Sequence, residues 1–339
     1  MRRKIFGLLA GVMALASVFG TTAGVLAEET ASGGETMVKS YLTGEDVPER
    51  IGRRRPVAVM MGNTSDAAPQ SGIANAGVVF EAPVEAEITR LMSVIEDYDD
   101  LERIGSVRSC RDSFIFYAYQ FNAIYAHYGQ SIYALKYLEN HNIENLNGIK
   151  MGSAAFYRTS DRSAPHNAYT SGDLLKNGIE QMGYSTEYRE DYEGHFQFSD
   201  EEVTLDGGEQ ALTVRLNNFK YNKPWFEYDE ATKKYKRFQF GDVHIDEVTG
   251  EQLTCDNIIL QYSEVEPYDA KGYLKIDAQN GGYGKYVTRG KAIDVFWYKN
   301  DPWGPVHYQD SNGQEIEINT GKTWIEIIHS DRTEDIVLE

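Results

Sequence analysis

The sequence predicts an α+β protein, with a mixed sheet covered by helices in its N-terminal half and an antiparallel β domain in its C-terminal half. Within residues 51–190, short apolar runs alternate with stretches of helical period, a pattern typical of strands and helices that form one layered sheet. Within residues 200–339, aromatic strands of alternating polarity are separated by turn signals such as Thr249-Gly250 and Asn312-Gly313, as in antiparallel hairpins.

The N-terminus has the order of a secretory signal peptide. Basic residues 2–4 precede an apolar run at 5–19, and Val25-Leu26-Ala27 offers a small-residue cleavage site, so residues 1–27 are predicted to be removed. The apolar run is too short for a comfortable membrane span. No cysteine lies near the cleavage site for lipid attachment. We therefore expect an extracytoplasmic chain, secreted or associated with the cell envelope, without a transmembrane helix in its mature form. Residues 28–50 are polar and aperiodic, which predicts a flexible leader.

The charge excludes one class of partner. The chain has 33 basic and 52 acidic residues and a formal charge of −19. The signal peptide carries three basic and no acidic residues, so its removal changes the charge to −22. Binding of nucleic acid requires clustered Lys and Arg, so no nucleic acid partner is expected.

In the N-terminal half, strands are predicted from apolar runs and helices from residues spaced along one face. The predicted strands are 57–61, 78–80, 89–95 and 123–126, and the predicted helices are 114–121, 131–139 and 171–182. Ser109 and Asp112 have the spacing of a capping pair for the first helix. In the C-terminal half, 225–228 and 235–238 form a predicted hairpin, with further strands at 258–260, 292–297 and 324–328.

Polar side chains follow several predicted strands. Asn63, Glu81, Glu85 and His127 come at or after strand ends, and Arg90 begins another strand. Ligands of open α/β sheets bind beyond the carboxyl ends of the strands, so these residues predict a crevice there. Paired carboxylates are the groups that glycoside cleavage requires. The alternative is a strand end held together by salt bridges.

Arg108 and Arg111 flank the predicted start of the first helix. Arginine suits forked binding of carboxylate or phosphate, and both arginines are candidate ligand-binding residues. The competing interpretation is that they pair with acidic neighbours.

A polar loop at 158–167 contributes Arg158, His166 and Asn167. His166, fixed beside a proline, suits a general acid or base, or it simply holds the loop together. The chain has no His-Glu-x-x-His motif, and we expect no metal site and no cofactor. A disulfide between Cys110 and Cys255 is one alternative, and two free cysteines are the other.

Several ordered motifs resemble the YerB-like family of bacterial envelope lipoproteins. They are Arg55-Pro56-Val57-Ala58-Val59-Met60, Pro69-Gln70-Ser71-Gly72, Phe80-Glu81-Ala82-Pro83-Val84-Glu85, Ile88-Thr89-Arg90, Ile104-Gly105-Ser106-Val107-Arg108-Ser109 and Ala164-Pro165-His166-Asn167. The resemblance implies two domains and an extracytoplasmic location, and it names no reaction. The family usually has a lipobox cysteine, which this chain lacks, and a small residue where Cys110 stands.

These observations favour a non-catalytic envelope protein that binds an anionic or glycan wall ligand in the N-terminal crevice. One alternative is a hydrolase of cell-wall glycan or peptide that uses Glu81, Glu85 and His166. Another is a scaffold that binds an envelope protein.

Overall fold

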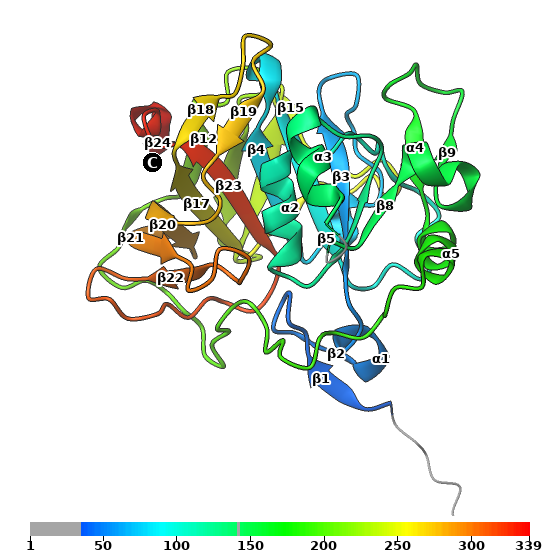
Figure 1. Cartoon of the computed structure of the whole chain (residues 1–339). Coiled ribbons are helices and arrows are strands. Elements are labelled where there is room, and N and C mark those ends of the chain that lie inside the picture. Colours follow the sequence, from blue (N-terminus) through cyan, green and yellow to red (C-terminus); the bar gives the residue numbers. More distant parts are fainter. Residues whose placement is uncertain (1–34, 141–142) are drawn as a thin grey trace, which may run out of the picture. The chain divides into compact units, whose positions relative to one another are not determined.

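Strands from both halves of the chain build one large sheet. The computed structural model describes residues 35–140 and 143–339, so the predicted signal peptide at 1–27 lies outside the described residues. Among the described residues, eleven strands form this sheet in the order β11-β21-β20-β17-β23-β4-β5-β3-β7-β8, with β22 paired to β21 (Figure 1). Their bounds are β3 Val57–Asn63, β4 Val78–Pro83, β5 Thr89–Ile95, β7 Ile124–His127, β8 Asn145–Asn147, β11 Glu209–Gln210, β17 Asn257–Ser263, β20 Gly281–Thr288, β21 Lys291–Tyr298, β22 His307–Gln309 and β23 Thr323–His329.

Both faces of this sheet are covered, which explains the continuous apolar runs in its central strands. Successive side chains of β3 point to opposite faces. Val57 and Val59 join the core that includes Leu175 of helix α5 (Gly172–Met182). The alternate residues Ala58 and Met60 join a second core, with the aromatic side chains of helix α2 (Asp112–Tyr119).

The second sheet is antiparallel and comes from the C-terminal half. Its strand order is β15-β14-β13-β12-β24, with β16 paired to β14. The strands are β12 Thr213–Leu216, β13 Trp225–Asp229, β14 Lys234–Gln239, β15 Asp242–Val243, β16 Thr254–Cys255 and β24 Ile336–Leu338. Phe226 and Tyr235 place this sheet on the α5 side of the large sheet.

The remaining elements are short. The helices are α1 Glu49–Gly52, α3 Ile132–Leu138 and α4 Gly148–Met151, with 3-10 turns η1 Ile73–Asn75, η2 Glu85–Glu87, η3 Gly152–Ala154 and η4 Thr333–Asp335. Three small ladders pair β1 Met37–Lys39 with β2 Asp46–Pro48, β10 Ala168–Thr170 with both β6 Ile104–Gly105 and β9 Tyr157–Arg158, and β18 Val265–Pro267 with β19 Leu274–Ile276.

The α+β class is confirmed, with a mixed large sheet and an antiparallel second sheet. The C-terminal half also contributes β17 and β23 to the large sheet, where β23 runs parallel to both β17 and β4. The predicted helix starts at 131 and 171 agree with the structure, where the side chains of Ser131 and Ser171 each accept a hydrogen bond from the first turn of α3 or α5.

Two predictions near the N-terminal half were wrong. The part of the predicted leader from residue 36 to 50 forms β1, β2 and the start of α1, because long-range contacts order it. Ser40 donates a hydrogen bond to buried Glu96 at 2.6 Å, and Gly44 lies directly against Phe198. Ser109 does not cap α2, whose N-cap is Arg111; the Ser109 hydroxyl instead donates to the carbonyl of Tyr128 at 3.1 Å.

Candidate functional site

Three parallel strands end at one edge of the large sheet. β3, β7 and β8 run in the same direction, so their carboxyl ends lie at the same edge. The segment before α2 crosses this edge: the Arg108 amide donates to Met60 at 2.8 Å, and the Arg108 carbonyl accepts from Tyr128 at 2.9 Å. The Arg108 side chain packs on Gly62, where an added Cβ would stand 3.0 Å from Arg108 Cγ.

Arg108 belongs to what we call the arginine cluster, which comprises Arg90, Arg108, Arg111 and Arg158. Glu85, in η2, binds Arg111 through two oxygens, with Nε at 2.9 Å from Oε2. Arg90 lies 3.8 Å from the same carboxylate and donates to the carbonyl of Ser109. Among the described residues, Glu85 is the one carboxylate that forms an ion pair with this cluster.

Burial and the crowding of positive charge shift the pKa values of the cluster. Burial, reinforced by the charge of Arg111, lowers the pKa of Arg90 to about 9. Burial and Arg111 also lower the pKa of Arg108. Burial alone would raise the pKa of Glu85, but the hydrogen bond and charge of Arg111, together with Arg90, outweigh it and the pKa is lowered. The cluster therefore carries excess positive charge in a partly desolvated place.

Arg108 is the least satisfied member. Its side chain is half-buried, yet its guanidinium makes no hydrogen bond or ion pair with any residue that the structure describes. Its nearest charged neighbours include two further cations, Arg111 and Arg158. A half-buried guanidinium with free donors has the chemistry that anion binding requires.

The loop at 158–167 lies beside Arg108. The charge of Arg108 contributes, after burial, to a lowered pKa of His166, while Asp66 opposes the shift. Arg158 lies over the Tyr128 ring at 4.5 Å and donates to Asn167 Oδ1 at 2.6 Å. Asn167 in turn donates to the Thr159 carbonyl at 2.9 Å and closes the loop.

Two predicted site residues belong instead to a closed circuit of buried hydrogen bonds, which we call the polar ring. Arg237 binds Glu81, and Asn63 donates to Glu81 at 3.0 Å. Arg237 also donates to Nδ1 of His244 at 2.5 Å; since arginine only donates, the His244 proton sits on Nε2 and is donated to Gln70 Oε1 at 2.7 Å. Gln70 closes the ring by donating to Asn63 at 3.2 Å.

The polar ring is a structural feature that joins the two halves of the chain. Glu81 and Arg237 are both fully buried. Glu81 accepts further hydrogen bonds from Thr89 and Asn222. Glu326 of β23 stands in register with Glu81, and burial together with the Glu81 charge raises its pKa well above the ordinary value.

His127 lies apart from the arginine cluster's side chains. It is fully buried, its Nδ1 lies 2.8 Å from the Gly129 carbonyl and its Nε2 lies 3.2 Å from Asn145 Oδ1. Burial lowers its pKa, so the neutral ring fixes the turn after β7. The two cysteines are free and buried, and burial raises the pKa of Cys110 to about 12, which leaves it a neutral thiol.

The described part of the chain has no group of three or more His, Cys, Asp or Glu side chains arranged to hold a metal ion. It also has no helix that is long and apolar enough to cross a membrane.

The fold and the site define a two-part α+β protein with a cationic site at the strand ends of its N-terminal half. Residues 42–185 match the N-terminal domain, and residues 212–325 the C-terminal domain, of the family described as "Protein of unknown function (DUF3048)". The chain belongs to this YerB-like family.

Two relatives support this assignment. The chain is 32% identical over 292 residues to the Bacillus subtilis (strain 168) protein named "Putative lipoprotein YerB", covering 86% of each chain. It is also similar to the crystal structure of the YerB protein from Bacillus subtilis, with a TM-score of 0.79 and 29% identity, over 89% of this chain and 99% of that one.

Proposed function

We propose that this protein is an exported cell-envelope protein that binds an anionic ligand, free or part of a wall glycan, through the arginine cluster. The observation that carries the proposal is the guanidinium of Arg108, which is half-buried and makes no hydrogen bond or ion pair among the described residues. Two like charges, Arg111 and Arg158, and one opposite charge, Glu85, act on it. An anion in contact with Arg108 relieves this repulsion and forms charge-assisted hydrogen bonds.

The chain as a whole restricts the kind of anion. Its formal charge of −19 repels extended polyanions at long range. The cluster therefore favours a compact anionic group, such as a phosphate or carboxylate on a sugar, over a long charged polymer. The ring of Tyr128 beneath Arg158, and that of Tyr273 5.4 Å from the Arg111 guanidinium, supply aromatic surface next to the cations, which suits a sugar ring.

An envelope location is supported by the order of basic, apolar and small residues at 1–27 and by the name of the Bacillus relative, which calls that protein a lipoprotein. We include this location in the proposal.

The hydrolase alternative loses support from the geometry. Glu81 is fully buried and engaged by Arg237, Asn63, Thr89 and Asn222. Glu85 is bound by Arg111. A general acid must reach the substrate, and neither carboxylate is free to do so. The scaffold alternative would rely on other surfaces, such as exposed Tyr283 and Phe296, whose rings meet edge to face at 5.8 Å.

The proposal is tested by titrating the purified protein with glucose 1-phosphate, glucuronate and inorganic phosphate, with glucose as the neutral probe, in a calorimeter. Arg108→Ala should weaken the binding of the anionic probes at least tenfold. The matched control Arg215→Ala removes an exposed arginine of β12 that lies 3.7 Å from Glu339 and should leave binding unchanged. Equal affinities for Arg108→Ala and the unmodified protein, or no binding of any anion, would overturn the proposal.

A further inference from the structure

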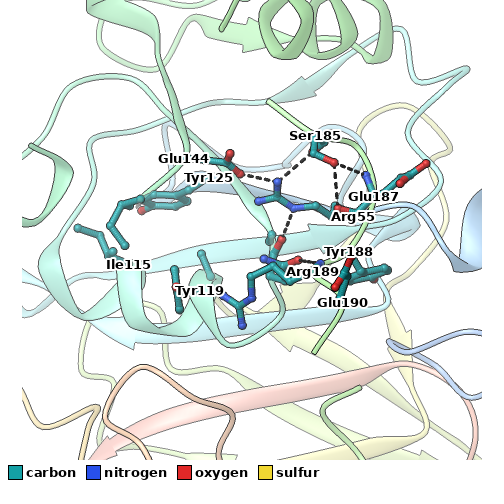
Figure 2. A pocket seen from close by; sticks show the side chains of 14 residues that line it. Arg55, Ile115, Tyr119, Tyr125, Glu144, Ser185, Glu187, Tyr188, Arg189 and Glu190 are labelled. Carbon is teal, nitrogen blue, oxygen red and sulfur yellow. Dashed lines mark hydrogen bonds and ion pairs between the residues drawn. The ribbon is translucent and has the colours of Figure 1, made fainter. Parts of the chain in front are cut away.

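A cavity of about 420 Å³ shares no lining residue with the arginine cluster. Figure 2 shows it between α2 and the segment at 185–190, with Arg55 at its centre. Its volume falls within the range of small-molecule sites, about 300–1,000 Å³.

One wall of the cavity is apolar and comes from α2 and the chain that follows it. Ile115, Ala118 and Tyr119 lie on α2, and Ala123 and Tyr125 continue this wall into β7. Ile115 and Ala118 are almost fully buried, so the partly exposed ring of Tyr119 is the part of this wall that an aliphatic side chain would contact.

Part of the opposite, polar wall is already satisfied. Arg55 donates to the carbonyls of Asn122 at 2.7 Å and Ser185 at 2.9 Å, and it forms an ion pair with Glu144 (Figure 2). These contacts fasten the segment at 185–190 to the sheet. Arg55 and Glu144 therefore shape the cavity, and their charges balance each other.

Other charges on this wall remain available. The Arg189 side chain is 43% exposed, its guanidinium lies 5.1 Å from the Tyr119 ring, and its one ion pair among the described residues is with exposed Asp191 at 3.3 Å. The carboxylates of Glu187 and Glu190 make no ion pair or hydrogen bond with any residue in the described ranges, although both line the cavity. The Arg189 backbone is held in place, because its amide donates to Asn122 Oδ1 at 2.9 Å.

We infer that this cavity binds a short peptide in its zwitterionic form. The peptide carboxylate pairs with Arg189, its ammonium group pairs with Glu190 or Glu187, and an aliphatic side chain lies against the apolar wall at the ring of Tyr119. A purely anionic ligand would be repelled by Glu187 and Glu190, and a purely cationic ligand would be repelled by Arg189. A zwitterion can pair with both the cationic and the anionic side chains of the cavity. The excess of carboxylates in the lining favours a ligand with at least one cationic group.

The test uses the purified protein and four forms of one dipeptide, measured by calorimetry. They are leucyl-leucine, its N-acetyl derivative, its C-terminal amide, and the form blocked at both ends. Leucyl-leucine should bind saturably, and blocking either end should weaken binding at least tenfold. Arg189→Gln should weaken leucyl-leucine at least tenfold and leave the affinity for the C-terminal amide unchanged. The double variant Glu187→Gln, Glu190→Gln should weaken leucyl-leucine and leave the N-acetyl form unchanged.

Arg215→Gln is the control and should not alter dipeptide binding. Arg108→Ala removes the anion contact of the arginine cluster and should leave the saturable binding at the cavity in place. The carboxylates at 187 and 190 have no hydrogen-bond or ion-pair partner among the described residues, so the double variant should keep its melting temperature. The inference is overturned by three results: no saturable binding at millimolar dipeptide, equal binding of the four forms, or loss of binding on Arg108→Ala.

Discussion

Arg237→Met tests whether the polar ring holds the two halves of the chain together. Arg237 and Glu81 are fully buried. Methionine keeps apolar contact with Trp324, whose ring lies 4.2 Å from the Arg237 guanidinium, but it leaves the Glu81 carboxylate without its cation. Breaking a buried pair from one side costs about 3–5 kcal/mol of unfolding free energy.

The expected loss appears as a fall in melting temperature. A change of 1 kcal/mol shifts the midpoint by about 2–4 °C in proteins of 150–250 residues. For this longer chain the lower figure applies, which gives a fall of roughly 6–10 °C by calorimetry. Arg215→Met, on the exposed face of β12, should shift the midpoint by less than about 1 °C, since surface changes cost within about 0.5 kcal/mol.

A second substitution separates charge from packing. Adding Glu81→Gln to Arg237→Met removes the uncompensated carboxylate, so the double variant should recover a large part of the lost stability. A fall of less than 2 °C for Arg237→Met, or no recovery in the double variant, would refute the view that Glu81 depends on Arg237.

Three further predictions concern other parts of the molecule. Burial raises the pKa of Glu96 to about 7, and because the folded protein holds this proton above the unfolded pKa, stability should fall as pH rises from about 4.5 to 7. Glu96→Gln should flatten this decline in melting temperature. An unchanged slope would assign the decline to other groups. In urea denaturation, Arg111→Ala should lower the unfolding free energy by about 1–2 kcal/mol because it removes the main partner of Glu85. Arg108→Ala should change the unfolding free energy by less than about 0.5 kcal/mol. Equal losses would show that Arg108 has a structural partner. A proteolytic cut within 190–208 should leave both fragments associated in size-exclusion chromatography, because β4 pairs with β23; fragments that separate would show that the halves are independent.

Local patterns in the sequence were sufficient where local physics decides the structure. Ser131 and Ser171 mark helix starts because their side chains satisfy amides of the first turn, and this requires only neighbouring residues. Burial on both faces shows in the continuous apolar run of β3. The same reasoning failed for residues 36–50, since contacts such as Ser40 with Glu96 have no local signature.

The partner of Glu81 was hidden for the same reason. Arg237 lies 156 residues away along the chain, and no spacing rule connects the two. A signal was nevertheless present. The side chains of Tyr235 and Arg237 point to the same face of the predicted hairpin, and this face is buried. An arginine that points to the same buried face as a tyrosine needs a buried acidic partner. A search for an unpaired carboxylate at a strand end would therefore have pointed to Glu81.

The large sheet carries two sets of charges near the same strand ends, and their balance separates structure from function. In the polar ring, Glu81 and Arg237 neutralise each other, and burial together with the charge of Glu81 raises the pKa of Glu326. In the arginine cluster, Glu85 serves Arg111 and approaches Arg90, while Arg108 stays without a partner among the described residues. The charges are balanced in the first set and not in the second, and a fold gains nothing from crowding like charges. This imbalance is the reason for proposing that an anionic ligand binds at the second set.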